Sequence, residues 1–206
     1  MIRSRTWRST VLSCALAIAL PAVAVVAAEE VRRAASHRDE KLSIDGIANF
    51  GRMNDRLYRG AQPTAAGFAQ LRARGLDTVV RLSLGDEGSA AERAVVETLG
   101  MHFVNLPWSS VRDPNAEQIV AFLTLVKEHP ERKIFVHCKA GADRTGVFVA
   151  LYRIAVDRWT PSRALDEMKA FHYRYVFLPH LQAYVESFPS RLSSEPAFGA
   201  LEASAY

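Results

Sequence analysis

The chain has 206 residues, of which 49% are hydrophobic and 23% are charged, and no repeat or low-complexity block is visible. This composition fits one ordinary globular domain with appendages and excludes repeat architectures. The net charge is +4, but the first 28 residues hold three arginines and no acidic residue, so the remainder is nearly neutral, with 23 basic against 22 acidic residues. Because no basic stripe with interleaved aromatic residues is present either, nucleic acid is not an expected partner.

The first 28 residues have the features of an export signal. Three arginines precede an uncharged run, residues 11–28, which Pro21 interrupts and which small residues close before Glu29. This order is typical of a cleaved secretory signal peptide, and we expect the protein to be periplasmic or secreted. The alternative is an uncleaved anchor that holds the domain outside the cytoplasm, because 18 uncharged residues are near the minimum for spanning a bilayer. A membrane is an expected partner only in that case.

The sequence pattern divides the chain into four parts. The expected parts are a signal peptide or anchor over 1–28, a charged linker over 29–41, a domain over 42–190 and a C-terminal tail over 191–206. Export would remove Cys14 and leave Cys138 as the only cysteine, so no intrachain disulfide could form. This favours a reactive rather than a structural thiol.

Strand-like and helix-like segments alternate along the domain. Residues 47–58 predict a small hairpin or entry strand, and Thr64 predicts the N-cap of the first helix. Ser89 and Glu92 form a capping box that predicts the start of another helix. Further strands are expected at 77–84, 101–106 and 133–136, and further helices at 115–128, 147–156, 161–171 and 179–188. The alternation predicts a single α/β domain with a mostly parallel central sheet flanked by helices.

Ten residues, His137 to Gly146 with the sequence HCKAGADRTG, lie between an expected strand and an expected helix. A loop of this kind directs its backbone N–H groups toward one point, and the positive end of the helix dipole adds to them. Gly141 and Gly146 allow the tight backbone path. The segment therefore predicts a binding site for a dianion of the size of phosphate.

Cys138 and Arg144 predict the reaction at this site. A cysteine flanked by His137 and facing an arginine is expected to favour the thiolate, which is the nucleophilic form. Arg144 can hold two phosphoryl oxygens in a bidentate fork, which a lysine cannot do. Together they predict attack of Cys138 on phosphorus, a phosphocysteine intermediate and its hydrolysis by water, with Thr145 stabilising the sulfur as leaving group. No cofactor or metal is expected.

The pattern His-Cys, five residues, Arg-Thr-Gly resembles the phosphate loop of the cysteine-dependent protein tyrosine phosphatases, and the compact chain resembles their dual-specificity branch. The resemblance covers roughly residues 57–175 and implies that the domain over 42–190 is a phosphatase. It also implies that the phosphoryl group is bound by the loop positions Lys139, Ala140, Gly141, Ala142, Thr145 and Gly146. Rhodanese-type sulfur transferases also place a cysteine in a loop before a helix, but their loop resembles this one less.

The loop allows two other interpretations. A buried structural cysteine would leave two glycines, a threonine and an arginine at these offsets as coincidence. A catalytically idle phosphate-binding module remains an alternative, and the presence of both Cys138 and Arg144 favours the enzyme.

A general acid is needed to protonate the leaving oxygen, and related phosphatases supply it from an aspartate on the loop after the strand at 101–106. Here Pro107 is followed by Trp108, Ser109 and Ser110, so the sequence departs from the family pattern. The nearest carboxylate on this loop is Asp113, which could instead be a helix N-cap before Pro114. The rival is Asp143, because repulsion by the bound dianion favours a protonated carboxyl there, although it could also cap the following helix. Both remain candidates.

The expected substrate is a phosphorylated protein or an inositol phosphate. Lys139 beside the nucleophile resembles the phosphate loop of dual-specificity phosphatases that act on inositol lipids, and a solvated lysine is the alternative. Four further arginines could widen a basic mouth if the fold brings them together: Arg52, Arg56, Arg59 and Arg112.

Overall fold

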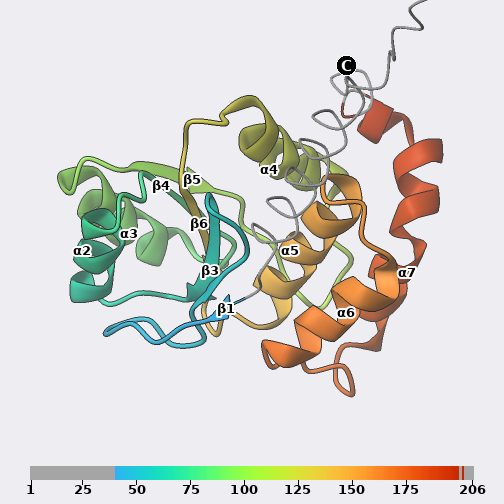
Figure 1. Ribbon diagram of the computed structural model, residues 1–206, viewed down its shortest axis with the longest axis horizontal. Helices are drawn as coiled ribbons and strands as arrows, with labels where there is room; N and C mark the ends of the chain where they lie inside the picture. The colour runs from blue at the N-terminus through green and yellow to red at the C-terminus, as the bar shows by residue number, and fades with distance from the viewer. Residues whose placement is uncertain (1–39, 200, 202–206) are drawn as a thin grey trace, which may run out of the picture. The chain divides into compact units, whose positions relative to one another are not determined.

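The computed structural model describes residues 40–199 and 201, which form an α/β domain around one six-stranded sheet with the order β1-β2-β3-β6-β4-β5. The strands are β1 (Glu40–Lys41), β2 (Gly51–Arg52), β3 (Leu57–Ala61), β4 (Thr78–Arg81), β5 (His102–Asn105) and β6 (Ile134–Cys138). The four strands from β3 to β5 are parallel, and only the pairs β1–β2 and β2–β3 are antiparallel. The predicted mostly parallel sheet is confirmed (Figure 1).

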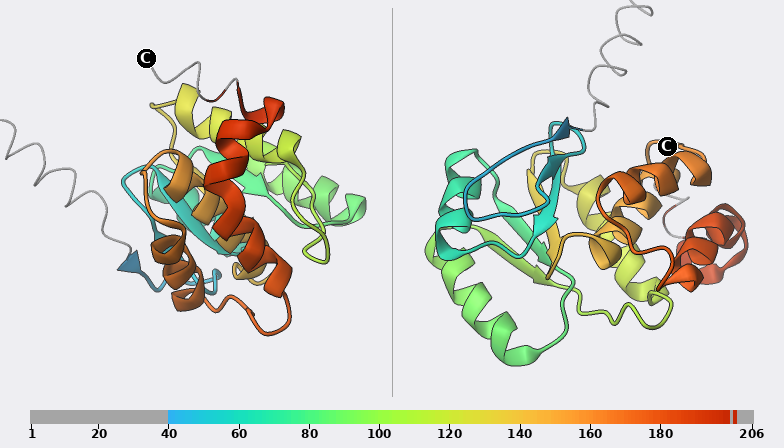
Figure 2. Two further views of the ribbon diagram at one scale, coloured as in Figure 1. Left: turned by 90° about the vertical axis from the view of Figure 1, so that its right-hand side faces the viewer. Right: turned by 90° about the horizontal axis from the view of Figure 1, so that it is seen from below.

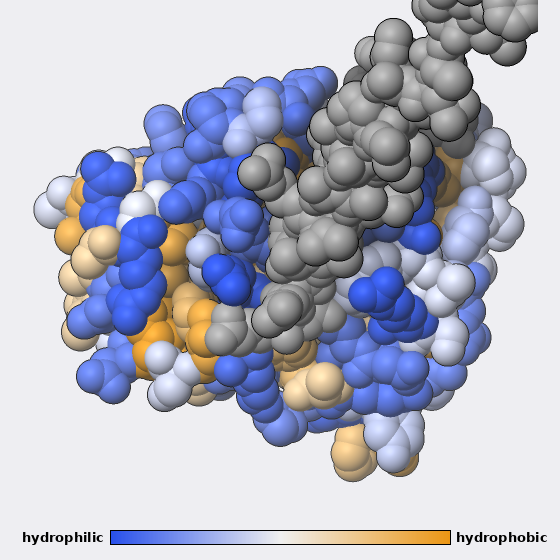
Figure 3. Space-filling view, in the orientation of Figure 1, coloured by the Kyte–Doolittle hydropathy of each residue, from blue (hydrophilic) through white to orange (hydrophobic). Residues whose placement is uncertain are grey.

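Helices cover both faces of the sheet (Figures 1 and 2). The helices are α2 (Ala65–Ala73), α3 (Asp86–Thr98), α4 (Ala116–Glu128), α5 (Asp143–Ala155), α6 (Pro161–Ala170) and α7 (Pro179–Ser194), followed by the 3₁₀ turn η1 (Pro196–Phe198). One core cluster joins α2 and α3 to the sheet, and the larger cluster joins α4 to α7 to its other face. The outer surface seen in Figure 3 is largely hydrophilic, with hydrophobic patches mainly on the side of α2 and α3.

Local sequence signals explain most helix boundaries. Thr64 caps α2 by accepting a hydrogen bond from Gly67 N, and Asn115 caps α4 by accepting one from Glu117 N. Thr160 caps α6, which begins at Pro161, where a missing N–H costs nothing. The predicted capping box of Ser89 and Glu92 was wrong, because α3 begins at Asp86, before Ser89.

The C-terminal packing extends beyond the last expected helix. α7 continues past residue 188 to Ser194, although Pro189 lies inside it. Phe198 in η1 is completely buried and packs edge-to-face on Phe188, with ring centroids 5.5 Å apart. The folded structure thus includes part of the segment that was expected to be a tail.

The expected signal peptide or anchor over 1–28 lies outside the described residues, as does most of the expected linker. Within residues 40–199 and 201, no helix combines the length and hydrophobicity needed to cross a membrane.

The position of β6 determines where a site can form. This strand lies between β3 and β4 and is parallel to both, with Cys138 paired to Ala61 and His137 paired to Arg81. In an open parallel sheet, ligands bind beyond the carboxyl ends of the strands. Cys138 is the last residue of β6, so the predicted loop opens at that edge.

Candidate active site

The predicted phosphate loop joins β6 to α5. Cys138 ends β6, and α5 begins at Asp143, so the turn itself is Lys139 to Ala142. The N-cap residue, Ala142, makes no side-chain hydrogen bond to the first turn of α5. The N–H groups of that turn are therefore left for a ligand, and the helix dipole favours an anion there.

A pocket of about 670 Å³ opens above this loop. It is lined by Asn49, Ser110, Cys138, Lys139, Ala140, Ala142, Asp143, Arg144, His172 and Arg174. Cys138 is 3% exposed, whereas Lys139 and Ala140 are exposed. The pocket thus places a recessed thiol below an open rim, and a substrate must extend a phosphoryl group into it.

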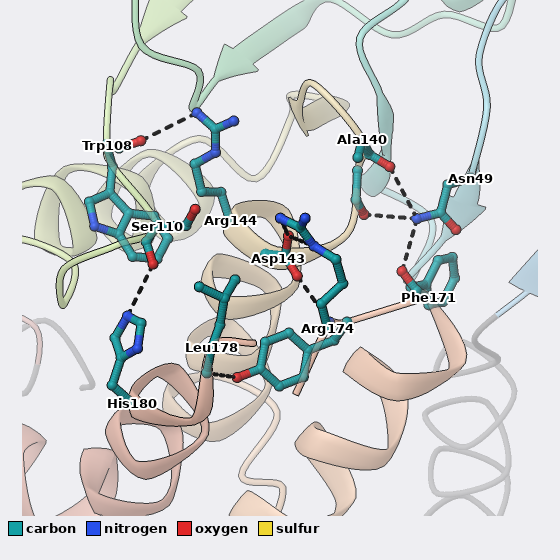
Figure 4. Close-up of polar contacts among 12 residues, drawn as sticks. Asn49, Trp108, Ser110, Ala140, Asp143, Arg144, Phe171, Arg174, Leu178 and His180 are labelled. Carbon is teal, nitrogen blue, oxygen red and sulfur yellow. Dashed lines mark hydrogen bonds and ion pairs between the residues drawn. The ribbon is translucent and has the colours of Figure 1, made fainter. Parts of the chain in front are cut away.

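The backbone at Gly141 requires glycine. Its φ is +66°, and a Cβ would lie 2.3 Å from the carbonyl carbon of Gly60 in β3. The Gly141 carbonyl accepts hydrogen bonds from Asn49 Nδ2 and from Arg59 Nη2, each at 3.0 Å. Asn49 Nδ2 also donates to the carbonyls of Ala140, at 3.4 Å, and Phe171, at 3.0 Å (Figure 4). Two side chains from the start of the domain therefore fix the path of the loop.

Arg59 lies beneath the loop and not at the pocket mouth. It is completely buried, its guanidinium stacks on the Phe171 ring at 4.1 Å, and its Nη1 lies 3.7 Å from Glu167 Oε1. Glu167 also pairs with Arg153 in α5 at 2.9 Å. This buried group of charges ties β3, α5 and α6 together behind the loop.

The fold does not bring the four further arginines together at the pocket mouth. None of Arg52, Arg56, Arg59 and Arg112 lines the pocket. Arg56 donates to the carbonyl of His129, near the start of β6, which is the opposite end of the sheet from the loop. The cations that line the described pocket are Lys139, Arg144 and Arg174.

Arg144 uses one end of its guanidinium to contact the two neighbouring loops. Its Nη1 donates to the carbonyl of Leu82, after β4, at 3.3 Å. It also donates to the carbonyl of Trp108, after β5, at 3.3 Å (Figure 4). A guanidinium has five N–H donors, so the edge formed by Nε and Nη2 can still bind two oxygens. Arg144 is half-buried and lines the pocket together with Cys138.

His137 is completely buried beside the nucleophile. Its Nε2 lies 2.6 Å from Glu92 Oε1, and the other oxygen of Glu92 lies 3.3 Å from Arg81 Nε and 3.1 Å from Gln62 Nε2. Glu92, from α3, therefore orients the residue that precedes Cys138. The spacing from Ser89 had predicted a capping role for Glu92, and that role was wrong because its carboxylate points into this buried cluster.

Asp143 lines the pocket, but its carboxylate is occupied. It accepts hydrogen bonds from Arg174 N at 3.0 Å, Arg174 Nε at 2.9 Å and Arg174 Nη2 at 2.6 Å (Figure 4). The side-chain hydrogen bonding to Asp143 raises the pKa of Arg174, with a further contribution from the charges of Asp143 and Cys138, so the guanidinium stays charged.

Asp113 does not line the pocket in this conformation, and its side chain is exposed. The alternative role for Asp113, as a helix N-cap, is not found, because Asn115 caps α4. Trp108 Nε1 donates to the backbone carbonyl of Asp113 at 3.2 Å, which closes the loop after β5 on itself. The neighbouring Ser110 does line the pocket, and its carbonyl lies 3.0 Å from His180 Nε2.

Thr145 and Gly146 lie behind the loop, within the first turns of α5. Thr145 is completely buried, and its hydroxyl has no hydrogen-bond partner among the described residues. A Cβ on Gly146 would lie 3.4 Å from Met168, an ordinary contact distance, and its φ is not positive, so of the two glycines only Gly141 requires the special backbone path expected for both. The structure thus brings most predicted loop residues to one pocket and adds four residues that the sequence did not predict there: Asn49, Ser110, His172 and Arg174.

The chain is similar to known phosphatases. A family model described as "DSP-PTPase phosphatase fused to NAD+ Kinase" matches residues 24–175. The chain is 35% identical over 127 residues to the dual specificity protein phosphatase TpbA of Pseudomonas aeruginosa (strain UCBPP-PA14), a match that covers 62% of this chain and 56% of the relative. The chain thus spans little more than half the length of that relative.

Two further comparisons are with proteins whose names state a ligand or a substrate. A crystal structure of P. aeruginosa TpbA in complex with pTyr superposes with a TM-score of 0.62 at 27% identity, covering 81% of this chain and 95% of that one. The inositol diphosphatase DSP4 of Arabidopsis thaliana is 24% identical over 129 residues, covering 60% of this chain and 63% of the relative.

Proposed function

Because the chain belongs to the DSP-PTPase phosphatase family of that description, we propose that it hydrolyses phosphomonoesters with Cys138 as the nucleophile. The observation that carries the proposal is the place of this thiol. Cys138 lies recessed in a pocket, between the carboxyl end of the central strand and the amino end of α5, with Arg144 in the same lining. A thiol held there faces an anion site from below.

In the first step the Cys138 thiolate attacks phosphorus in line with the leaving oxygen. The S–P bond forms, the P–O bond to the leaving group breaks, and a general acid donates a proton to the departing oxygen. The Nε and Nη2 edge of Arg144 and the N–H groups at the start of α5 hold the equatorial oxygens, whose charge they stabilise in the transition state.

In the second step water attacks the phosphocysteine. The carboxylate left by the first step takes a proton from the attacking water, the S–P bond breaks, inorganic phosphate is released, and the thiolate of Cys138 is restored. The Thr145 hydroxyl, which no described residue uses, is available to hydrogen-bond the departing sulfur. The step needs no electron transfer and no co-reactant besides water.

Asp113 is our proposed general acid. The alternative, Asp143, has its carboxylate oxygens bound by three donors of Arg174 and is held as an anchor. Asp113 has an exposed carboxyl on the segment whose Ser110 already borders the pocket. A shift of the loop after β5 would bring its carboxyl to the leaving oxygen, as mobile loops do in many enzymes.

The substrate we propose is a phosphorylated protein, with tyrosine or dual specificity. A recessed thiol suits a phosphoryl group carried on a long side chain, and relatives named dual specificity phosphatase, one of them solved with pTyr, support this class. An inositol phosphate is the second candidate, favoured by the exposed Lys139 on the pocket rim and by the relative named inositol diphosphatase.

A substrate panel tests the proposal. Purified protein should release phosphate from p-nitrophenyl phosphate and from a phosphotyrosine peptide, more slowly from inositol phosphates, and Cys138→Ser should release none, because a serine hydroxyl is almost never ionised there. If the parent bound phosphate but hydrolysed none of these compounds, the chain would be a phosphate-binding module. A higher kcat/KM for inositol phosphates than for the peptide would make an inositol phosphate the preferred substrate.

A further inference from the structure

The segment between α6 and α7 exposes three consecutive large apolar side chains. Tyr175 is 53% exposed, Val176 is 69% exposed and Phe177 is 78% exposed. They form the only such consecutive run among the described residues. In the left view of Figure 2 this segment is the loop that joins the two helices. A cluster of exposed apolar side chains on a soluble domain commonly marks a binding surface.

The turn that carries these side chains is well anchored. Phe177 N and Leu178 N both donate to the carbonyl of Arg174, at 3.0 and 3.1 Å. The buried Tyr173 hydroxyl donates to the carbonyl of Leu178, and burial raises the pKa of Tyr173 to about 12, so the hydroxyl keeps the proton that it donates. The apolar side chains are thus presented by a fixed backbone, which lowers the entropy cost of binding a partner.

The same turn is attached directly to the active-site pocket. Arg174, which precedes Tyr175, lines the pocket and is bound to Asp143 by its backbone N–H and its guanidinium. On another part of the rim, Ser110 lines the pocket and Val111 after it is 74% exposed (Figure 4 shows Ser110 and Arg174). Both segments therefore border the pocket through which a phosphoryl group reaches Cys138.

We propose that Val111 and the run Tyr175, Val176 and Phe177, here called the apolar rim, bind an apolar side chain next to the phosphorylated residue of a protein substrate. The proposal rests on the proposed phosphatase function and adds a sequence preference to it. Because Asp143 anchors Arg174, the run that follows Arg174 is held beside the bound phosphoryl group, so that one substrate segment can contact both.

A peptide fits the rim better than a membrane surface does. Binding to an anionic membrane surface typically uses a cluster of four to eight basic residues. On the two segments that form the rim, Arg112 is followed by Asp113, and Arg174 is ion-paired with Asp143 at 2.6 Å. The apolar rim therefore lies on segments with little net charge, which suits an uncharged peptide side chain.

The test compares two phosphotyrosine peptides that differ only in their flanking residues, Leu in one and Ser in the other. The parent protein should show a KM for the Leu peptide about fivefold lower than for the Ser peptide, which is ~1 kcal/mol at 1.4 kcal/mol per factor of ten. Val176→Ser and Phe177→Ser should each remove most of this difference. Val156→Ser is the matched control, since Val156 is 40% exposed at the far end of α5.

Peptide affinity for Cys138→Ser, with and without Val176→Ser, gives the same comparison without turnover. Tighter binding of the Leu peptide would support the role of the apolar rim even if the parent protein hydrolysed neither peptide. In that case only the proposed phosphatase function would be contradicted. Equal affinity for both peptides would contradict the proposed role of the apolar rim without affecting the proposed phosphatase function. An equal loss with both peptides in Val176→Ser would show a structural role, and binding to phosphatidylserine vesicles that Phe177→Ser abolishes would assign the rim to a membrane.

Discussion

Arg144 donates hydrogen bonds to the carbonyls of Leu82 and Trp108 through one nitrogen, Nη1. Its other N–H groups are left to bind phosphate. Lysine could replace the single-point contact but not the planar two-point grip. We expect Arg144→Lys to lower kcat/KM for p-nitrophenyl phosphate by about 10²–10³-fold, the usual cost of losing a preorganised transition-state donor.

Arg112→Lys provides the control for that change, because Arg112 is exposed and lies outside the pocket lining. Parent-like kcat/KM in Arg144→Lys would mean that Arg144 only braces the two loops.

Replacing each candidate acid should affect the hydrolysis rate differently for substrates with poor and with good leaving groups. We expect Asp113→Asn to slow hydrolysis of phosphate esters with poor leaving groups by about 10²–10⁴-fold, the usual contribution of general acid catalysis, and to change p-nitrophenyl phosphate much less. Asp143→Asn should reduce hydrolysis of all substrates by a similar factor, because it removes the anchor of Arg174.

Steady-state kinetics on a series of aryl and alkyl phosphates separates these outcomes. Leaving-group dependence in Asp143→Asn alone would place the acid within the phosphate loop. Its absence from both variants would point to solvent or the substrate as the proton source.

At the scale of elements, the loop between β6 and α5 takes its shape from residues distant in sequence. Asn49 reaches the loop carbonyls from a backbone with φ of +51°, a conformation that glycine also adopts without strain. We therefore expect Asn49→Gly to keep the local backbone, remove three hydrogen bonds and lower kcat/KM about tenfold. The reason is that the loop amides lose their fixed orientation.

Arg158→Gly is the matched control, since Arg158 is exposed, has a φ of +59° and follows the far end of α5. Kinetics and thermal unfolding of both variants should show a loss of activity in Asn49→Gly alone. Unchanged kinetics in Asn49→Gly would show that Arg59 holds the loop without it.

The elements also show what a sequence can and cannot predict. The loop chemistry was readable because Cys138, Gly141 and Arg144 lie within a few residues of each other and their spacing has a direct physical meaning. The role of Glu92 could not be predicted, because its local capping pattern carries no information on the contact with His137, which is 45 residues away. Arg174 left no sequence signal, since nothing local to it indicates that the chain returns to Asp143 from 31 residues away.

At the scale of the whole molecule, the hydrophobic core extends to η1, beyond the expected domain boundary at residue 190. Phe198 is completely buried against Phe188 and belongs to the core cluster of α4 to α7. We expect Phe198→Ala to lower the free energy of unfolding by about 3 kcal/mol, the lower end for a buried phenylalanine. Phe177→Ala is the control, because Phe177 is 78% exposed and should change it by less than about 0.5 kcal/mol.

Urea unfolding of the two variants measures this difference. Equal midpoints would show that the domain is complete without η1.

The central claim is that Cys138 carries the phosphoryl group during turnover. The most direct measurement is acid quenching of the protein during hydrolysis of p-nitrophenyl phosphate, followed by mass spectrometry of the peptide that contains Cys138. We predict the mass of one added phosphoryl group on Cys138, more of it in Thr145→Ala, whose second step should be slower, and none in Cys138→Ser. Hydrolysis at the parent rate by Cys138→Ser, with no phosphoryl group on this peptide in the parent, would contradict the account.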